Sequence, residues 1–267
     1  MESRLSVSKS QLRDSLRKMI QTEKITPEGI ALVELQDYYL QRANKAKSQQ
    51  EAAKVIQSAF RNDPGIWWMA TGHTPDNVAQ LESEEHKVVQ FLSFLSEWEI
   101  FLCNRKGFVL LSVELETEEI VGVCCVMSPQ SEESYLDFII GLLTIKSTFW
   151  GFFSMQQRRA EAFGAWQKES RKRALENNLP IFLSMIAVRP DFHGRGIGKS
   201  LLQTLNLVSD DLKTPIYLET SVARNVELYK HFEYHVLDHL KRPVQVMRWN
   251  SENSFNLLTP MLRLPHL

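Results

Sequence analysis

The spacing of apolar residues along the chain predicts helices and short strands in alternation. Apolar residues recur every three to four positions, as on one face of a helix, over 50–61, 81–98 and 196–209. Shorter and nearly continuous apolar runs are typical of buried strands. These runs cover 38–43, 108–115, 120–127, 182–188, 215–221, 235–240 and 244–249.

The segment 130–180 interrupts this pattern and predicts a helical excursion. It holds two apolar stretches rich in aromatic residues, followed by a long charged helix. The remaining elements span 37–249 and are interpreted as one domain. Residues 1–36 are expected to form an N-terminal helical extension, and 250–267 an irregular C-terminal tail. Whether the extension packs on the domain stays open at this point.

A glycine-rich loop lies between the strand that ends at Val188 and the helix that follows. Gly194, Gly196 and Gly198 alternate with other residues, and such glycines permit positive φ and close approach of a ligand. The loop leads into a helix N-terminus, where unpaired N–H groups and the helix dipole favour an anion. Lys199 and Arg195 add positive charge. The pattern therefore indicates a cradle for a pyrophosphate.

Two common phosphate-binding motifs are excluded by spacing. A Walker loop needs a glycine where this chain has His193, although Gly198-Lys199-Ser200 matches its ending. A dinucleotide-binding fingerprint needs Gly-x-Gly-x-x-Gly early in a βαβ unit, and these glycines have a different spacing late in the chain.

The loop resembles motif A of the GNAT superfamily, the acyl-CoA-dependent N-acyltransferases, because it follows Val188-Arg189-Pro190 and precedes Leu201-Leu202. The family usually has Gln or Arg in place of His193. The resemblance implies an α/β (α+β) fold, with a mixed central sheet, a V-shaped splay between two parallel strands, and flanking helices. It also implies acetyl-CoA binding by Ile186, Ala187, Val188, His193, Gly194, Arg195, Gly196, Ile197, Gly198, Lys199 and Ser200.

A second block supports the first. The strand at 215–221 is followed by a helix over 223–232 that contains Asn225 and Tyr229. The resemblance implies that Asn225 contacts the coenzyme arm and that Tyr229 is the general acid toward the leaving thiolate. Glu233-Tyr234 replaces the usual Gly-Phe, so the exit of this helix is expected to be built differently. The ending of the helix at 50–61 is similar to that of puromycin N-acetyltransferase and its fungal relatives.

The acceptor amine must lose a proton before it attacks, because most primary amines are protonated near neutral pH. A general base is therefore required. We rank Glu219 first, with Ser184 on the neighbouring strand as a further candidate. Glu114 and Glu116, at the end of the neighbouring strand at 108–115, are the remaining candidates.

Composition limits the other functions. The net charge is −1, which gives no general bias toward nucleic acid. The longest membrane-span candidate, 138–153, is too short and contains Lys146. Cys103, Cys124 and Cys125 are interpreted as core residues of a reducing compartment, and no metal-binding spacing occurs. We expect a cytoplasmic protein without metal, membrane or nucleic-acid partner; the sequence does not indicate its oligomeric state.

The resulting hypothesis is an N-acetyltransferase that moves an acetyl group from acetyl-CoA directly to a primary amine of a small acceptor. Three alternatives stay open: a non-catalytic sensor of acyl-CoA, a protein or peptide acetyltransferase, and a calmodulin-type interaction through 53–61. The last rests on the Ile56-Gln57 pair followed by Arg61, and it requires Ile56 and Phe60 to be accessible.

Overall fold

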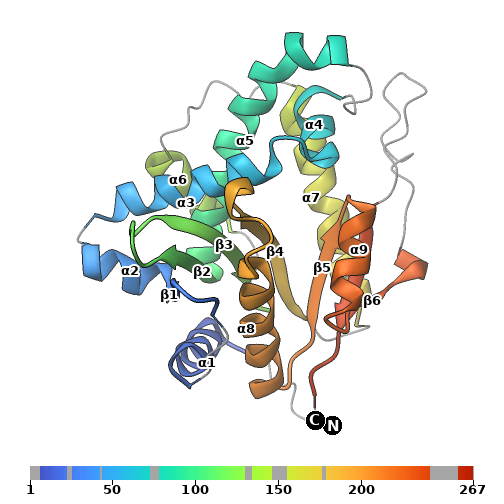
Figure 1. Cartoon of the computed structure of the whole chain (residues 1–267). Helices are drawn as coiled ribbons and strands as arrows, with labels where there is room; N and C mark the ends of the chain where they lie inside the picture. The colour runs from blue at the N-terminus through green and yellow to red at the C-terminus, as the bar shows by residue number, and fades with distance from the viewer. Residues whose placement is uncertain are drawn as a thin grey trace.

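The computed structural model describes residues 7–22, 26–42, 44–72, 78–129, 134–145, 155–175, 179–240 and 258–266. Its centre is a seven-stranded sheet in the order β1-β2-β3-β4-β5-β7-β6 (Figure 1). The neighbouring strands are antiparallel except β4 and β5, which are parallel. The strands are β1 Ile30–Glu34, β2 Gly107–Glu114, β3 Ile120–Met127, β4 Ile181–Val188, β5 Ile216–Thr220, β6 His235–Val236 and β7 Thr259–Arg263.

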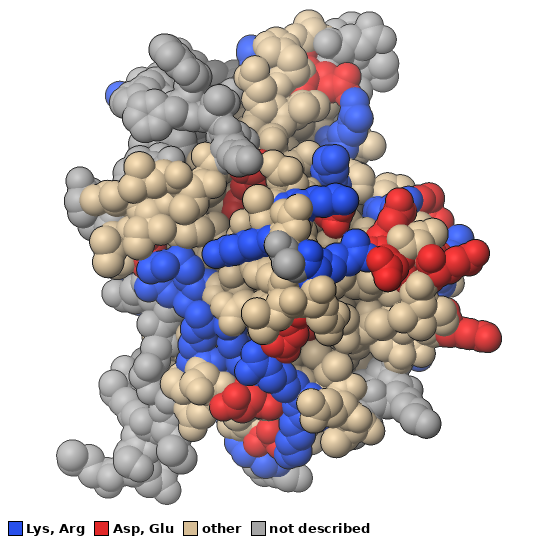
Figure 2. Space-filling model, turned by 90° about the vertical axis from the view of Figure 1, so that its left-hand side faces the viewer, with Lys and Arg blue, Asp and Glu red and all other residues tan. Residues whose placement is uncertain are grey.

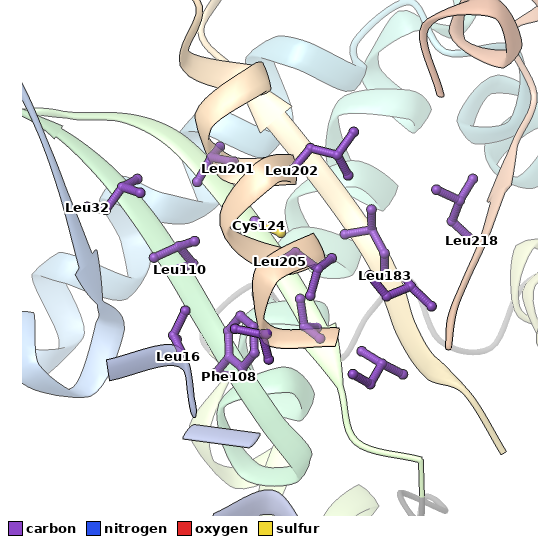
Figure 3. Close-up of a cluster of buried hydrophobic side chains, with 14 of the residues drawn as sticks. Leu16, Leu32, Phe108, Leu110, Cys124, Leu183, Leu201, Leu202, Leu205 and Leu218 are labelled. Carbon is purple, nitrogen blue, oxygen red and sulfur yellow. The ribbon is translucent and has the colours of Figure 1, made fainter. Parts of the chain in front are cut away.

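Helices cover both faces of this sheet. One face packs against α1 and α8, and the apolar cluster between them is drawn in Figure 3. The other face packs against α2, α3 and α5. A third cluster joins α4, α5 and α7 beyond the end of the sheet. The helices are α1 Lys9–Thr22, α2 Leu35–Arg42, α3 Lys45–Phe60, α4 Pro64–Thr71, α5 Val78–Lys106, α6 Tyr135–Thr144, α7 Met155–Arg173, α8 Ile197–Asp211 and α9 Ala223–Lys230.

The central strands and the main helices are confirmed. The strands predicted at 108–115, 120–127, 182–188 and 215–221 are β2 to β5, within one or two residues at each end. The predicted helices correspond to α3, α5, α8 and α9, although α5 is longer than its apolar period indicated. The excursion contains α6 and α7 as expected.

The prediction of a first strand at 38–43 was wrong, because these residues belong to α2. Leu35, Tyr38 and Tyr39 are all buried, and their spacing of three and four is that of one helix face. The first strand, β1, lies instead within the expected extension and follows Gly29, whose φ is 75°. Tyr38 and Tyr39 are residue types that favour strands, but the helical spacing of the buried residues is what the structure follows.

The C-terminal segment was also predicted wrongly in part. Residues 259–263, expected in an irregular tail, form β7 between β5 and β6. Arg263 is buried there and binds Asp210 through two hydrogen bonds of 2.9 and 3.0 Å. The strand expected at 235–240 is limited to β6, and a 3₁₀ turn at Asp238–Leu240 follows it. The strand expected at 244–249 lies outside the described residues.

Helix α1, in the N-terminal extension, packs on the domain. Leu12 and Leu16 are fully buried in the cluster that α1 shares with α8. The buried Arg13 donates hydrogen bonds of 2.8 Å to the Gly107 carbonyl and 2.7 Å to the Asn104 carbonyl. Its guanidinium also lies 3.5 Å from the buried carboxylate of Glu34. Arg13 therefore fastens α1 to the start of β2.

We expect Arg13→Met to lower the free energy of unfolding by about 3 kcal/mol, because it leaves Glu34 as a buried charge without its main partner. Chemical denaturation of the two proteins measures this difference. Lys18→Met is the control, since the exposed Lys18–Asp211 ion pair should contribute at most about 1 kcal/mol. Equal midpoints for wild type and Arg13→Met would contradict this role.

Basic and acidic side chains are intermixed on the face that carries α1 and α2. Figure 2 shows bands of lysine and arginine there, with aspartate and glutamate beside them. Arg17 binds Asp37 at 3.1 Å, and Arg42 binds Glu118 at 2.5 Å. Much of this positive charge is therefore neutralised locally. Among the helices of the described ranges, none is both long enough and apolar enough to cross a membrane.

Candidate active site

The two parallel strands separate at the point where the site begins. β4 and β5 pair only from Ile181 with Ile216 to Leu183 with Leu218. Beyond this pair both strands continue without pairing each other, and Figure 1 shows them diverging. A cavity of about 1800 Å³ opens here, lined by both strands, by the loop before α8, and by α4, α5, α7 and α9. The carboxyl ends of parallel strands are the common binding position in such sheets.

A β-bulge in β4 shapes the edge of the gap. The register with β3 passes from Met185–Cys125 to Leu183–Val126, so Ser184 is the extra residue. The Arg189 N–H donates to the Val121 carbonyl at 2.9 Å. Hydrogen-bonding directions alternate along an antiparallel strand, so the N–H groups of Val188 and Ile186 point to the other edge, toward the gap. Ala187, predicted with them, has its side chain buried in the core.

The glycine loop forms a cradle at the start of α8. Gly194 and Gly196 both have φ of 79°, and Gly196 is the N-cap of α8. The first backbone hydrogen bond of the helix is donated by the Ser200 N–H to the Gly196 carbonyl, at 3.0 Å. The N–H groups of the three preceding residues, 197–199, have no partner within the helix and are available to an anion.

Neither the backbone conformation nor the packing of the described chain requires a glycine at position 198. Its φ is not in the left-handed region. A Cβ atom added there would meet Val188 Cγ2 at 3.6 Å, which is an ordinary contact. A glycine with neither a conformational nor a packing requirement is explained by a ligand that approaches the backbone closely.

The side chains of the cradle do not all face the cavity. Lys199 and His193 line it, and His193 Nε2 lies 3.1 Å from the Val188 carbonyl oxygen. Ser200 is buried and donates to the Ile197 carbonyl at 2.9 Å. Arg195 is turned away: its guanidinium lies 4.4 Å from the Phe192 ring centroid and 3.8 Å from Glu114.

Two of the base candidates are therefore outside the main cavity. Glu114 and Glu116 line a separate groove of about 390 Å³ together with Arg195. Glu114 ends β2 and Glu116 lies in the turn that follows, at the same end of the sheet as the splay but beyond β3 and β4 from it. The structure does not bring them together with the other predicted site residues.

Helix α9 places both of its predicted residues in the cavity. Asn225 lies in the first turn, and its N–H donates to the Val222 carbonyl at 2.9 Å. Tyr229 is 7% exposed, with its ring packed against Tyr234 at a centroid distance of 5.7 Å. Burial raises the pKa of the Tyr229 hydroxyl, which is therefore protonated at neutral pH. The helix exit does differ: Glu233 takes the left-handed position, with φ of 66°.

Glu219 lies at the end of β5, just past the last pair with β4. Its Oε1 atom accepts a hydrogen bond of 2.5 Å from the Tyr217 hydroxyl. Burial raises the pKa of this carboxyl group to about 7, although hydrogen bonds from Tyr217 and Gln167 and the charge of Arg171 oppose the shift. A carboxyl group with this pKa is half ionised near neutral pH, and its ionised form can act as a general base.

The sequence analysis missed a second carboxylate in the cavity. The Ser184 hydroxyl donates a hydrogen bond of 2.6 Å to Glu99 Oε2, and both residues line the cavity. Glu99 follows Phe91 and Leu95 at spacings of four on α5. A charge in line with an apolar helix face was the signal that could have identified it.

Asp63 is another missed residue of the cavity wall. Its Oδ1 atom caps α4 by accepting from the N–H groups of Gly65 and Ile66, at 2.8 and 3.1 Å. Its Oδ2 atom accepts a hydrogen bond of 2.9 Å from Ser221, just past the end of β5. The pair links α4 to the strand that carries Glu219. The Asp63-Pro64 dipeptide, typical of a helix start, was the available signal.

Within the described ranges, no group of three or more His, Cys, Asp or Glu side chains is arranged to hold a metal ion. The three cysteines are buried and unbridged, as predicted. Ile56 is fully buried against the sheet, so the face that a calmodulin-type partner would need is part of the core.

Comparisons with known proteins agree with this geometry. Residues 152–236 match the family model described as acetyltransferase (GNAT) domain. The fold is similar to the C-terminal condensation domain of Ebony in complex with beta-alanyl-dopamine, at 12% identity over 90% of this chain and 100% of that chain, with a TM-score of 0.56. It is also similar to arylalkylamine N-acetyltransferase 2 from Aedes aegypti, at 11% identity over 90% and 100%, with a TM-score of 0.52. A comparison with curated protein sequences gives no match.

The match covers the glycine loop, β5 and α9, and it shows an acetyltransferase domain of the GNAT superfamily in this part of the chain. The fold of the chain is similar to the folds of these solved structures. The resemblance in motif A and the predicted fold class are therefore confirmed. The nearer likeness to puromycin N-acetyltransferase stays a prediction.

Proposed function

We propose that this protein is an N-acetyltransferase that uses acetyl-CoA and a primary amine of a small acceptor. The observation that carries the proposal is the position of the anion cradle at the mouth of a gap that also holds Tyr229 and Glu219. Walls from α4, α5 and α7 support a small acceptor over a protein surface. The similar solved structures bear names of amine acetylation or of an amine-derived ligand.

Binding of the coenzyme is assigned to main-chain groups first. The N–H groups of residues 197–199 would hold the pyrophosphate, and Lys199 would add a charge. The N–H groups of Ile186 and Val188 would bond the pantetheine arm as a neighbouring strand does, with Asn225 on its other side. Arg195 has no part in this assignment, because it faces the smaller groove.

The chemistry follows from the two titratable groups. Acetyl-CoA supplies the acetyl group as a thioester. Glu219 would remove a proton from the acceptor ammonium, directly or through water, so that the amine nitrogen can bond to the carbonyl carbon. The carbon–sulfur bond then breaks, and Tyr229 would donate its proton to the departing sulfur. The second proton, which the nitrogen loses as the amide forms, would restore the Tyr229 hydroxyl. The products are the N-acetylated amine and free coenzyme A.

Gly198→Val tests the cradle. We expect the Kd for acetyl-CoA to rise by at least about 100-fold, roughly 2.7 kcal/mol, because the side chain fills the approach to the helix N-terminus. Titration calorimetry measures the Kd. The matched control is Gly164→Val, which makes the same replacement on α7, away from α8, and should leave the Kd unchanged. Absence of heat with the wild-type protein, or equal Kd values for wild type and Gly198→Val, would overturn the proposed function.

A further inference from the structure

The cavity extends beyond the reacting groups into a region with an apolar wall on α5. Phe91, Phe94 and Trp98 lie three to four residues apart on this helix, and all line the cavity. The rings of Phe94 and Trp98 are stacked, with centroids 5.9 Å apart. The Trp98 ring packs directly against Gly141 of α6, where there is no room for a side chain: an added Cβ atom would lie 2.3 Å from the ring. This stripe forms a firm aromatic wall.

The stripe ends on a carboxylate. Glu99 is the next cavity-lining residue of α5 after Trp98, and Ser184 holds it at the bulge of β4. Glu219 stands at the corresponding position of β5, just past the last strand pair. A ligand lying along α5 would therefore have its apolar part against rings and its other end beside two acidic side chains, which suit an ammonium group.

Gly164 on α7 supplies an independent observation. It lies in the interior of the helix, where glycine costs about 1 kcal/mol relative to alanine. Its φ is not left-handed, and a Cβ atom added there would meet no heavy atom of the described chain within 4 Å. Gly164 lines the same cavity. Gly164 is exposed, so the open space beside it belongs to the accessible part of the cavity and is available to a ligand.

The charges of α7 do not suit a polyamine. The cavity-lining residues Glu161 and Lys168 flank Gly164 and have opposite signs. A polyamine would need acidic groups at several points along its length, and none of the cavity-lining residues of α5 from Phe91 to Trp98 is acidic.

We propose that the acceptor is a primary amine carried on a bulky apolar body of aromatic-ring size, which lies along the α5 stripe in space that Gly164 leaves open. This inference rests on the proposed function and adds the chemical class of the acceptor. Gly164 is a specificity-determining residue in this arrangement, and the carboxylates of Glu99 and Glu219 bind the amine end of the acceptor.

The test compares 2-phenylethylamine, ethylamine and 1,4-diaminobutane as acceptors, with release of free coenzyme A as the readout. The wild-type protein should have a kcat/KM for 2-phenylethylamine at least about tenfold above that for either other amine. Gly164→Leu should lower this kcat/KM by at least about tenfold and leave that for ethylamine within about threefold, because only the larger body needs the space. Ala162→Leu is the matched control: it adds the same side chain at an exposed position of α7 that does not line the cavity, and it should keep the preference.

The outcomes separate this inference from the proposed function. Acetylation of 1,4-diaminobutane in preference to 2-phenylethylamine, or an equal effect of Gly164→Leu on all three amines, would overturn the acceptor class and leave the acetyltransferase function in place. Absence of transfer to 2-phenylethylamine, with acetyl-CoA still bound in calorimetry, would also overturn the acceptor class alone. Absence of acetyl-CoA binding would overturn both.

Discussion

Glu219→Gln is expected to lower kcat/KM for acetyl transfer by about 10²–10⁴-fold, the usual contribution of a general base. Glutamine has nearly the same shape as glutamate and cannot accept the proton of the acceptor ammonium. Steady-state release of coenzyme A at saturating acetyl-CoA measures the change. Retention of wild-type kcat/KM would assign the proton transfer to another group. Glu99 would then be the next candidate for the general base, because it also lines the cavity.

The pH dependence tests the same assignment. Because the pKa of Glu219 is raised to about 7, wild-type kcat/KM should rise about tenfold per pH unit below that value, and this inflection should be absent in Glu219→Gln. The acceptor ammonium titrates separately, at higher pH. Tyr217→Phe is the matched control: it removes the hydrogen bond that stabilises the carboxylate and should move the inflection to higher pH.

Stability distinguishes a catalytic loss from a structural one. The folded-state pKa of Glu219 lies above its ordinary value of 4.5, so the fold favours the protonated form. The carboxyl group therefore contributes stability that is present at low pH and lost as the pH rises from 4.5 to about 7. Above that range Glu219→Gln removes a buried charge, and its thermal midpoint should equal or exceed that of the wild-type protein.

Tyr229→Phe is expected to lower kcat by about 10²–10⁴-fold and to leave the Kd for acetyl-CoA unchanged. The ring stays in its packed position, and only the proton donor to the leaving sulfur is lost. No hydrogen bond joins the Tyr229 hydroxyl to another described residue, so the variant should also keep its thermal midpoint. Single-turnover kinetics and calorimetry provide the two readouts.

The neighbouring Tyr234 supplies the control for this experiment. Its hydroxyl donates a hydrogen bond of 2.9 Å to the buried Asn206, away from the cavity. Tyr234→Phe should therefore cost about 1–3 kcal/mol of stability and leave kcat in place, the reverse of Tyr229→Phe. Unchanged kcat in Tyr229→Phe, or equal losses of kcat in both variants, would remove Tyr229 from the mechanism.

The coenzyme side of the site could be predicted because it is contiguous in the sequence. Strand β4, the glycine loop and α8 follow one another between Ile181 and Asp211, and a backbone cradle leaves a direct trace in its glycines. Tyr229 and Asn225 follow one strand later, on α9. Local spacing together with the family resemblance was sufficient to predict the elements that carry these residues.

The acceptor side could not be predicted in the same way, because its residues meet only through the tertiary fold. Ser184 and Glu99 are 85 positions apart, and Ser221 and Asp63 are 158 apart. Gly164 gives no sequence signal beyond a weak break in a helix. Only the cavity around it shows that the missing side chain is a property of the site.

The sheet edges were predicted less well than its centre. β2 and β3 are buried on both faces and are therefore almost entirely apolar. β7 contains a proline and the buried ion-paired Arg263, both of which weaken the pattern of a strand. Its partner Asp210 lies on α8, and nothing in the local sequence of either residue indicates this pairing.

The contact between α1 and α8 has a consequence for biosynthesis. Ser15 and Asp211, which bond each other across these helices, are 196 positions apart. While the chain grows on the ribosome, the apolar face of α1 is therefore covered only in part, by β1 and β2, until α8 has emerged from the exit tunnel. Uncovered apolar surface on nascent chains promotes aggregation and recruits chaperones. The candidate coenzyme site is built on α8 and α9 and is therefore completed late in synthesis, at the same stage as the cover of α1.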